Sequence, residues 1–301
     1  MKNLVLTFGS CGWDKIFSMD KDGNKHLIYE EEGRKNSHQA LAAKRAGANS
    51  MLISFVGNDE IGKMVLDSLN KCGIDTRFIK TVEGEPTEIN HQILDEVTKD
   101  YSLVRFPAPL SSYYTPDMVD QYKDWILRAD AVILVSKQNK DFLEEIIDFC
   151  YKNNILTVLT VSHEKFDVND KKDFETLKKV SFIAGNYKEV STLTKKEDIN
   201  EIFKLLPNII MTNGSDGVYY MNNDKLIHEE AVKVDNIVET NGAGDTFIGY
   251  FIVFYVEGMK KLKCIRLGQC ASSLEIQKMG VLNAIPNRSD VIDLYSRLYK
   301  E

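Results

Sequence analysis

Residues 239–247 read Glu-Thr-Asn-Gly-Ala-Gly-Asp-Thr-Phe, and an apolar stretch with helical spacing follows them. The small residues Gly242, Ala243 and Gly244 would let an oxygen-rich ligand approach the backbone. There the free N–H groups of a helix start point at the ligand, and the helix dipole favours negative charge. Asp245 comes next, at a predicted cap position. The alternative is a purely structural turn in which Asp245 caps a buried helix, and two upstream segments bear on the choice.

The first upstream segment is T-x-G-x-x-G, formed by Thr212, Gly214 and Gly217 after an apolar strand. Such a strand end can turn its backbone amides toward a phosphate or a sugar, although Asn-Gly and Asp-Gly are also common hairpin signals. The second is N-x-x-E, in which Asn186 and Glu189 share one helical face after another strand. They could hold hydrated Mg²⁺ or phosphate oxygens. Alternatively, Asn186 caps a helix that carries Glu189 in its first turn.

The rest of the chain alternates short apolar runs with helical stretches, which is the rhythm of a mainly parallel sheet with helices on both faces. Most runs are continuously apolar, as expected for strands that are covered on both sides. They are Leu4–Phe8, Met51–Val56, Ala131–Val135, Leu156–Val161, Phe182–Ala184 and Ile209–Thr212. With no repeat and no Pro/Gly/Ser linker, the sequence predicts one α/β domain over residues 1–301, folded as a three-layer α/β/α structure.

Two stretches break this rhythm. Residues 15–29 hold two short strands around the turn signal Asp-Lys-Asp-Gly-Asn. Residues 88–106 alternate apolar and polar side chains on both sides of a polar turn at Asp95–Asp100. We predict a small antiparallel β lid, inserted at about 15–30 and 88–107, that closes over the carboxyl ends of the main strands. Because a bare lid would expose a strand edge and an apolar face, a homodimer through the lid is also predicted.

Composition narrows the class of protein. The 301 residues include 38 Lys and Arg and 45 Asp and Glu, which gives a net charge of −7. This acidic balance gives no indication of binding to nucleic acid or anionic lipid, which usually goes with an excess of basic residues. No apolar run approaches the roughly 20 residues of a membrane span, and the N-terminal run is too short for a signal peptide. Five cysteines without a C-x-x-C pair fit a reducing compartment. The sequence therefore predicts a cytoplasmic protein with no nucleic-acid or membrane partner.

Taken together, these segments resemble the PfkB-type carbohydrate kinases, on the ribokinase side of that group. N-G-A-G-D-T-F is the most specific match, followed by T-x-G-x-x-G and N-x-x-E in the expected order. In the N-terminal half, residues 9–14 resemble the family's G-x-x-x-x-D strand end, residues 33–40 its glycine-led sugar loop, and residues 56–62 its V-G-x-D-x-x-G segment. The resemblance spans nearly the whole chain and implies a ribokinase-like fold.

The resemblance also implies an ATP-dependent kinase that phosphorylates a hydroxymethyl group of a small sugar or sugar derivative. Asp245 would be the catalytic base, and the turn Gly242-Ala243-Gly244 the anion hole for the transferring phosphoryl group. Phosphoryl transfer relies on positioning and fixed dipoles, which suits this arrangement. An aspartate beside a helix start is expected to stay ionised and to be a weak base. ATP and water-bound Mg²⁺ would be held by the upstream segments: Asn186, Thr212, Gly214 and Gly217 for ATP, and Glu189 for Mg²⁺.

A monovalent cation beside the anion hole, as in many ribokinase-like enzymes, is a further implication. Glu239 and Asn241 would be its ligands, although Glu239 replaces the family's usual Asp and Asn241 a common Thr. The longer carboxylate of Glu239 could still reach an ion, so K⁺ activation is a hypothesis.

By the same resemblance, the acceptor site includes Asp14, whose carboxylate could accept two sugar hydroxyls, and Gly33, which leads the sugar loop. Alternatively, Asp14 caps the loop that follows it. Arg34 replaces the second glycine of the loop, His38 replaces the usual Asn, and Lys137 falls about where ribokinases place an acid. The added cations favour a substrate with a carboxylate, a phosphate or another acceptor-rich group. The competing interpretation is that Arg34 and Lys137 are solvated surface charges.

Two other functions remain open at this point: a nucleoside kinase of the same fold, and a non-catalytic sensor of a sugar or nucleotide that has kept the fold. An intact Asp245 with its anion hole argues against the sensor. The chain lacks G-x-x-x-x-G-K-[ST], H-R-D and D-F-G segments, so P-loop and protein-kinase chemistry are unsupported.

Overall fold

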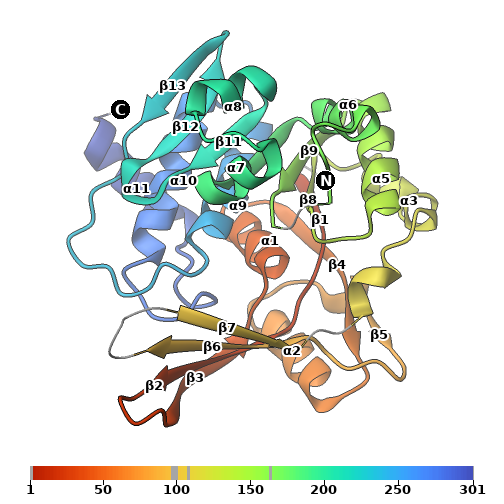
Figure 1. Ribbon diagram of the computed structural model, residues 1–301, viewed down its shortest axis with the longest axis vertical. Helices are drawn as coiled ribbons and strands as arrows, with labels where there is room; N and C mark the ends of the chain where they lie inside the picture. The colour runs from red at the N-terminus through yellow and green to blue at the C-terminus, as the bar shows by residue number, and fades with distance from the viewer. Residues whose placement is uncertain (1–2, 96–100, 107–108, 163–164, 301) are drawn as a thin grey trace.

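The computed structural model describes residues 3–95, 101–106, 109–162 and 165–300, and its centre is a nine-stranded sheet (Figure 1). The order is β13-β12-β11-β10-β9-β8-β1-β4-β5, and every neighbouring pair from β11 to β5 is parallel. All six strands predicted from apolar runs are present. The strands are β1 (Leu4–Phe8), β4 (Asn49–Gly57), β5 (Ile79–Val82), β8 (Ala131–Val135), β9 (Leu156–Thr160), β10 (Phe182–Asn186), β11 (Ile209–Thr212), β12 (Val218–Asn222) and β13 (Lys225–Glu229).

Helices cover both faces of this sheet, because strand side chains alternate between two buried clusters. In β1, Val5 belongs to one cluster, and Leu4 and Leu6 belong to the other. The first cluster is closed by α1 (Lys35–Arg45), α2 (Glu60–Lys71), α9 (Ala243–Val256), α10 (Lys261–Glu275) and α11 (Arg288–Tyr299), and the second by α3 (Asp117–Gln121), α4 (Lys123–Ile126), α5 (Lys140–Lys152), α6 (Lys171–Lys179), α7 (Tyr187–Thr194) and α8 (Ile199–Leu205). The three-layer α/β/α fold is confirmed. That the chain forms a single domain stays a prediction. None of the helices in the described ranges is long and apolar enough to cross a membrane.

A second sheet, with four strands in the order β3-β2-β6-β7, forms the lid below the body in Figure 1. It combines the hairpin of β2 (Trp13–Met19) and β3 (Lys25–Glu32) with that of β6 (Ile89–Asp95) and β7 (Tyr101–Phe106). Both hairpins are antiparallel, as predicted, but β2 and β6 pair in parallel. The reason is that both strands start from the body, after β1 and β5, and run outward together. Of the predicted polar turn, residues 96–100 lie outside the described part of the chain.

The V-G-x-D-x-x-G segment joins the lid to the body. The Asp59 carboxylate caps α2 by accepting from the Gly62 N–H at 2.7 Å. It also accepts from the N–H and the hydroxyl group of Thr87, at 2.7 and 2.6 Å, and Thr87 Oγ1 accepts from the Gly57 N–H at 3.0 Å. Because Thr87 comes just before β6, this cluster fixes the point at which the lid strand leaves the body.

The chain order of the strands reverses at β1, which lies between β8 and β4. In open α/β sheets, ligands bind beyond the carboxyl ends of the strands at such a point. Residues that follow β1 and β8 meet at this edge, and the first lid hairpin begins there at Trp13. The topology therefore places the candidate site between this edge and the lid.

Candidate active site

The glycine-rich stretch lies at the start of α9, as predicted. Gly242 is the N-cap with a φ of 88°, in the left-handed region that favours glycine, and a Cβ atom there would lie 2.5 Å from Val281 Cγ1. Ala243 and Gly244 open the helix. Asp245 is therefore in the first turn and not at the cap, so its interpretation as an N-cap residue is wrong. The Ala243 N–H makes a long bond of 3.4 Å to the Thr240 carbonyl oxygen, and the start of this long helix is an arrangement suited to an anion.

The Asp245 carboxyl group is held by two residues of α1. Gln39 Nε2 donates to Asp245 Oδ1 at 2.8 Å, and the Lys35 ammonium group favours the ionised form. Burial is the stronger influence and raises the pKa of Asp245 to about 7, with Lys35 and Gln39 opposing the rise. The expectation of a permanently ionised weak base is corrected accordingly. Near neutral pH this carboxyl group both takes up and releases a proton, which suits a general base.

Lys35 connects Asp245 to the N-x-x-E segment. Its Nζ donates to Glu189 Oε1 at 2.9 Å and to the Val161 carbonyl oxygen at 3.2 Å. Burial acts to lower the pKa of Lys35, but the charges of Asp245 and Glu189 outweigh it, so the pKa is raised. The ammonium group therefore keeps its positive charge between two acids.

Asn186 and Glu189 form a capping box at the start of α7. The Glu189 N–H donates to Asn186 Oδ1 at 2.9 Å, and the Asn186 N–H donates to Glu189 Oε2 at 2.8 Å. The helix-cap interpretation of this pair is confirmed, and Glu189 Oε1 remains as the oxygen that bonds Lys35. Within the described ranges, no group of three or more His, Cys, Asp and Glu residues could hold a metal ion. A magnesium ion here would take most of its ligands from water and phosphate.

The T-x-G-x-x-G segment links β11 to β12 as an antiparallel hairpin, which confirms the hairpin interpretation. Gly217 must be glycine, because its φ is 113° and a Cβ atom would lie 2.1 Å from the Glu229 carbonyl oxygen. Gly214, with a φ of 55°, opens the turn between the strands. Thr212 and Asn186 are register partners in β11 and β10, so both segments end at the same edge of the sheet.

The lid side of the site is a network of four charged residues, of which three are buried and Lys137 is partly exposed. Arg34, at the cap of α1, donates from Nη1 to Asp14 Oδ1 and from Nε to Glu88 Oε2, the latter at 3.1 Å. Lys137, which follows β8, donates to the other oxygen of Glu88. The side chains of Asp14, Arg34 and Glu88 are at most 10% exposed, so the interpretation of Arg34 as a solvated surface charge is wrong. Two positive and two negative charges balance within the network.

The two acids of the network differ in how well their charge is compensated. Burial has the largest effect on Asp14 and raises its pKa in spite of Arg34. Burial acts in the same direction on Glu88, but Arg34 and Lys137 together outweigh it, and the pKa of Glu88 is lowered. Gln92 Nε2, on lid strand β6, donates to Asp14 Oδ2 at 3.1 Å. Both oxygens of Asp14 thus have partners within the chain.

Gly33 and His38 belong to the same loop and helix start. A Cβ atom on Gly33 would lie 2.5 Å from Asp14 Oδ2, which explains the glycine. His38 is 3% exposed, its Nε2 lies 3.4 Å from the Glu32 carbonyl oxygen, and burial lowers its pKa to about 4. The ring is therefore neutral near pH 7 and adds no positive charge to the acceptor site.

Glu239 and Asn241 lie just before the helix start, where a monovalent cation was predicted. Glu239 is already bound within the chain: its Oε2 accepts from the Gly280 N–H at 2.9 Å, and its Oε1 accepts from the Tyr29 hydroxyl group at 2.7 Å. Asn241 is half-buried in the turn. The carboxylate of Glu239 therefore ties lid strand β3 to the loop that begins at Gly280.

A further acid lies beside the anion hole. Glu275 is 1% exposed, and its Oε1 is 3.1 Å from the place where a Cβ atom on Gly242 would lie. Burial, followed by the charges of Asp245, Glu239 and Glu31, raises the pKa of Glu275 to about 9. A cation near these acids would favour the ionised form of Glu275.

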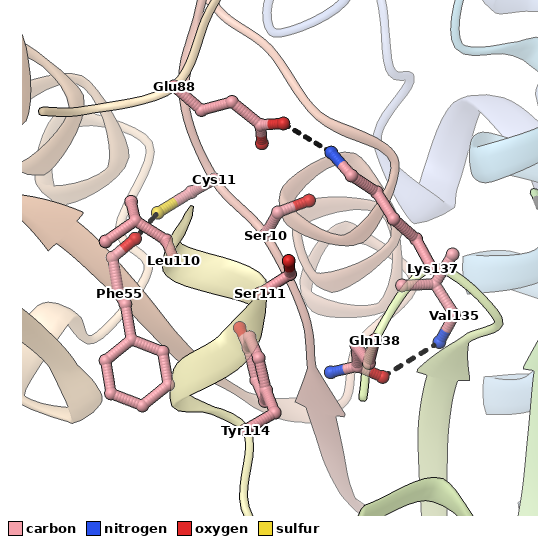
Figure 2. A pocket seen from close by; sticks show the side chains of 10 residues that line it. All are labelled: Ser10, Cys11, Phe55, Glu88, Leu110, Ser111, Tyr114, Val135, Lys137 and Gln138. Carbon is pink, nitrogen blue, oxygen red and sulfur yellow. Dashed lines mark hydrogen bonds and ion pairs between the residues drawn. The ribbon is translucent and has the colours of Figure 1, made fainter. Parts of the chain in front are cut away.

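A cavity of about 20 Å³, enough for one water molecule, adjoins the charged network (Figure 2). Figure 2 shows the Glu88–Lys137 ion pair along its wall, with Ser10 and Ser111 nearby. Ser10 follows β1, and Lys137 and Gln138 follow β8. The cavity therefore marks the point where the strand order reverses, next to the acceptor end of the site.

Three residues of the site were missed by the sequence reasoning: Lys35, Gln39 and Glu88. Lys35 and Gln39 are four residues apart, which places them on one face of α1, so a signal was present within the sugar loop. Glu88 offered none, because only the folding of the lid brings it to Arg34.

The fold, its lid and a carboxyl group beside a helix start suited to an anion together match the arrangement expected of a kinase of small molecules. The sequence profile of the pfkB family carbohydrate kinases matches residues 35–288. The chain belongs to this family and is a carbohydrate kinase, as the sequence motifs predicted.

Known proteins with related sequences and structures agree with this assignment. The ribokinase of Bacillus subtilis (strain 168) is 26% identical over 303 residues, which cover 98% of this chain and 100% of the relative. Arabidopsis thaliana ribokinase, complexed with ribose and ATP, has a TM-score of 0.86 at 21% identity and covers 98% of this chain and 99% of its own. The nucleoside kinase of Burkholderia thailandensis in complex with inosine has a TM-score of 0.79 at 15% identity, covering 98% of both chains. The ribokinase-like fold is confirmed.

Proposed function

We propose that this carbohydrate kinase transfers the γ-phosphoryl group of ATP to a hydroxymethyl group of a small sugar or sugar derivative. The observation that carries the proposal is Asp245, which lies in the first turn behind the glycine-rich helix start and is bonded by Gln39 at 2.8 Å. With a pKa raised by burial to about 7, it can accept the hydroxyl proton as the acceptor oxygen bonds to phosphorus.

Fixed positive charge on this side of the site supports the transfer. The backbone N–H groups of Gly242, Ala243 and Gly244 would bind the oxygens of the transferring group, and the Lys35 ammonium group lies between Asp245 and Glu189. Donors that are already oriented need no rearrangement as charge develops, which is the main source of catalysis in such sites. The rest of ATP would be bound along the edge formed by Asn186, Thr212, Gly214 and Gly217.

Magnesium, when bound with ATP, supplies positive charge that offsets the phosphates. Glu189 would hold it through water, because Mg²⁺ gives up its hydration reluctantly. The donor chemistry fits: Glu189 Oε1 is a carboxylate oxygen whose partner is the Lys35 ammonium group, a contact for which a hydrated cation can compete.

The acceptor would bind at the end of the site beside the lid, where Asp14, Gly33 and Arg34 contact one another. The buried His38 would support the start of α1 from the protein interior. The ribose bound by the Arabidopsis relative favours a sugar as the acceptor. The inosine bound by the Burkholderia relative keeps a nucleoside as the second candidate. Rates with pentoses, hexoses, sugar acids and nucleosides would separate the two.

ATP consumption with that panel of acceptors is the test of the proposal. Asp245→Asn should keep ATP binding and lose on the order of 10²–10⁴ in turnover. Asp67→Asn, at an exposed position of α2, should leave turnover unchanged. Near-normal turnover of Asp245→Asn would remove Asp245 from its role, and no ATP consumption with any acceptor would favour a non-catalytic sensor.

We also propose activation by a monovalent cation such as K⁺, bound near Glu239 and Asn241. The buried Glu275 beside Gly242 supports this, because a bound cation would favour the ionised form of a carboxyl group that burial otherwise keeps protonated. Rates compared in K⁺ and in a large organic cation decide the matter, and equal rates would dismiss it.

Finally, we propose that two copies of the chain pair through the lid in the cytoplasm. The outer strands of the lid carry exposed apolar side chains: Leu27 (52%) and Ile28 (42%) on β3, and Leu103 (46%), Val104 (42%) and Phe106 (48%) on β7. Exposed apolar edges of this kind are normally covered, and the five free cysteines fit a reducing setting. Sedimentation as a dimer, converted to a monomer by Leu27→Asp with Val104→Asp, is the expected result; a monomeric wild type would contradict it.

A further inference from the structure

Arg34 fills the space beside Gly12, the residue that precedes the lid. A Cβ atom on Gly12 would lie 2.9 Å from Arg34 Cζ and 3.0 Å from Nη2, so only glycine there leaves room for the guanidinium group. Arg34 is held in this place by Asp14 and Glu88, and its Nη1 also donates to the Gly33 carbonyl oxygen at 2.7 Å. A bidentate group fixed by two buried acids has little freedom to turn away.

Asp14 is consequently withdrawn from the acceptor. Its Oδ1 accepts from Arg34, and its Oδ2 accepts from Gln92 at 3.1 Å, while its side chain is only 9% exposed. Each oxygen already accepts from a donor of the chain and the carboxylate is nearly enclosed, so Asp14 offers a sugar much less accepting capacity than a free carboxylate would. The carboxylate-to-hydroxyl contact expected of this position is thus replaced by an internal ion pair.

One nitrogen of the guanidinium group, Nη2, is left over with its two N–H donors. Arg34 Nη2 is buried and has no hydrogen-bond partner among the described residues. A buried donor of this kind costs free energy until a ligand or a water molecule supplies an oxygen. Glu88 does not serve as that partner, since its two oxygens accept from Arg34 Nε and from Lys137.

We propose that Arg34 is the specificity-determining residue of the acceptor site. It presents a hydrogen-bond donor where a free Asp14 would present an acceptor, so the enzyme selects a substrate that offers a carbonyl or carboxylate oxygen at this point instead of a pair of hydroxyl groups. Asp14 and Glu88 act through Arg34 as positioning residues. The inference rests on the proposed function for the identity of the acceptor site.

The test measures the affinity of the acceptor in the absence of ATP, so that the result does not depend on catalysis. Arg34→Gly is combined with Glu88→Gln, which removes the guanidinium group, frees Asp14 and leaves no unpaired acid at position 88. Calorimetry then compares D-ribose with D-ribonate. The double variant should gain at least tenfold in affinity for ribose, and its preference should move from ribonate toward ribose. No gain in ribose affinity, or a move toward ribonate, overturns the proposal. A failure of phosphoryl transfer with every acceptor would count against the proposed function alone.

Two further variants guard against a merely structural effect. Arg34→Lys keeps the charge but cannot span Asp14 and Glu88, and it should give an intermediate preference. Arg77→Gly removes an exposed arginine that pairs with Asp75, and it should change neither affinity. Thermal unfolding shows whether the double variant is folded. If it is not, the same calorimetric comparison on Arg34→Lys tests the proposal, and an unchanged preference between ribose and ribonate in that variant overturns it.

Discussion

Replacing Asp245 by Asn should make the protein more stable above neutral pH while it abolishes most of the turnover. Asn keeps an oxygen that can accept from Gln39 Nε2, the bond that Asp245 makes at 2.8 Å, but it removes the ionisable group. Burial raises the pKa of Asp245 from 3.8 to about 7. Ionising this group therefore costs free energy in the folded state that it does not cost in the unfolded state.

The size and direction of the effect follow from this shift. The difference between about 7 and 3.8 is about 3 pKa units, equivalent to about 4 kcal/mol. Because the residue is partly exposed, water reduces the penalty, and we expect about 1–2 kcal/mol. The folded state binds the proton more tightly, so the wild type loses stability as the pH rises from about 4 to about 7. The advantage of Asn grows over the same range and is complete above it.

Urea unfolding between about pH 5 and pH 8 measures this advantage. At pH 8 the Asn variant should exceed the wild type by about 1–2 kcal/mol in free energy of unfolding, and at pH 5 by less than half of that. Asp67→Asn, which removes an equal charge from an exposed position, should show no such trend. An Asp245→Asn variant no more stable than the wild type at pH 8, or equally favoured at every pH, would refute the argument from burial.

The remaining predictions concern activity and folding. Turnover should fall below about pH 7, because the base must be ionised and its pKa is about 7; a profile that is flat between pH 5.5 and pH 8 would count against Asp245 as the base. Lys35→Met should move this acid limb to higher pH, since Lys35 favours the ionised form, and should lower turnover by about tenfold or more; an unmoved limb would show that the charge of Lys35 does not reach Asp245. Gly242→Ala should cost about 2–3 kcal/mol in urea unfolding, because its Cβ would meet Val281 at 2.5 Å at a positive φ; a wild-type unfolding midpoint would contradict this. Asp59→Ala should cost about 2 kcal/mol through three lost hydrogen bonds, and a change within experimental error would mean that other contacts fix the lid.

The main sheet could be predicted because its strands are buried on both faces and read as continuous apolar runs. Leu4–Phe8 and Ala131–Val135 match β1 and β8 residue for residue. The edge strand β5 gave no such pattern, since Lys80 and Thr81 within it are exposed. The parallel pairing of β2 with β6 was also out of reach, because it depends on where both lid strands leave the body.

The site divides in the same way. Gly242 and Asp245 could be predicted because a helix start is a local feature, set by neighbouring residues. The ion pair of Arg34 and Glu88 joins residues that are 54 positions apart in the sequence, so no local sequence pattern could predict it. The pKa of Asp245 was misjudged for the same reason: the helix start favours ionisation, but the surrounding α1 and α9 remove enough water to reverse the balance.

Arg34 and Lys35 are adjacent in sequence, yet Arg34 contacts Glu88 at the lid and Lys35 contacts Glu189 at the start of α7. A single rigid peptide unit separates them. A ligand that displaces the backbone at Arg34 would act on the neighbour of Lys35, so the two ends of the site are linked through adjacent residues of one chain segment. For a redesign of substrate preference at position 34, both affinity and rate should therefore be measured.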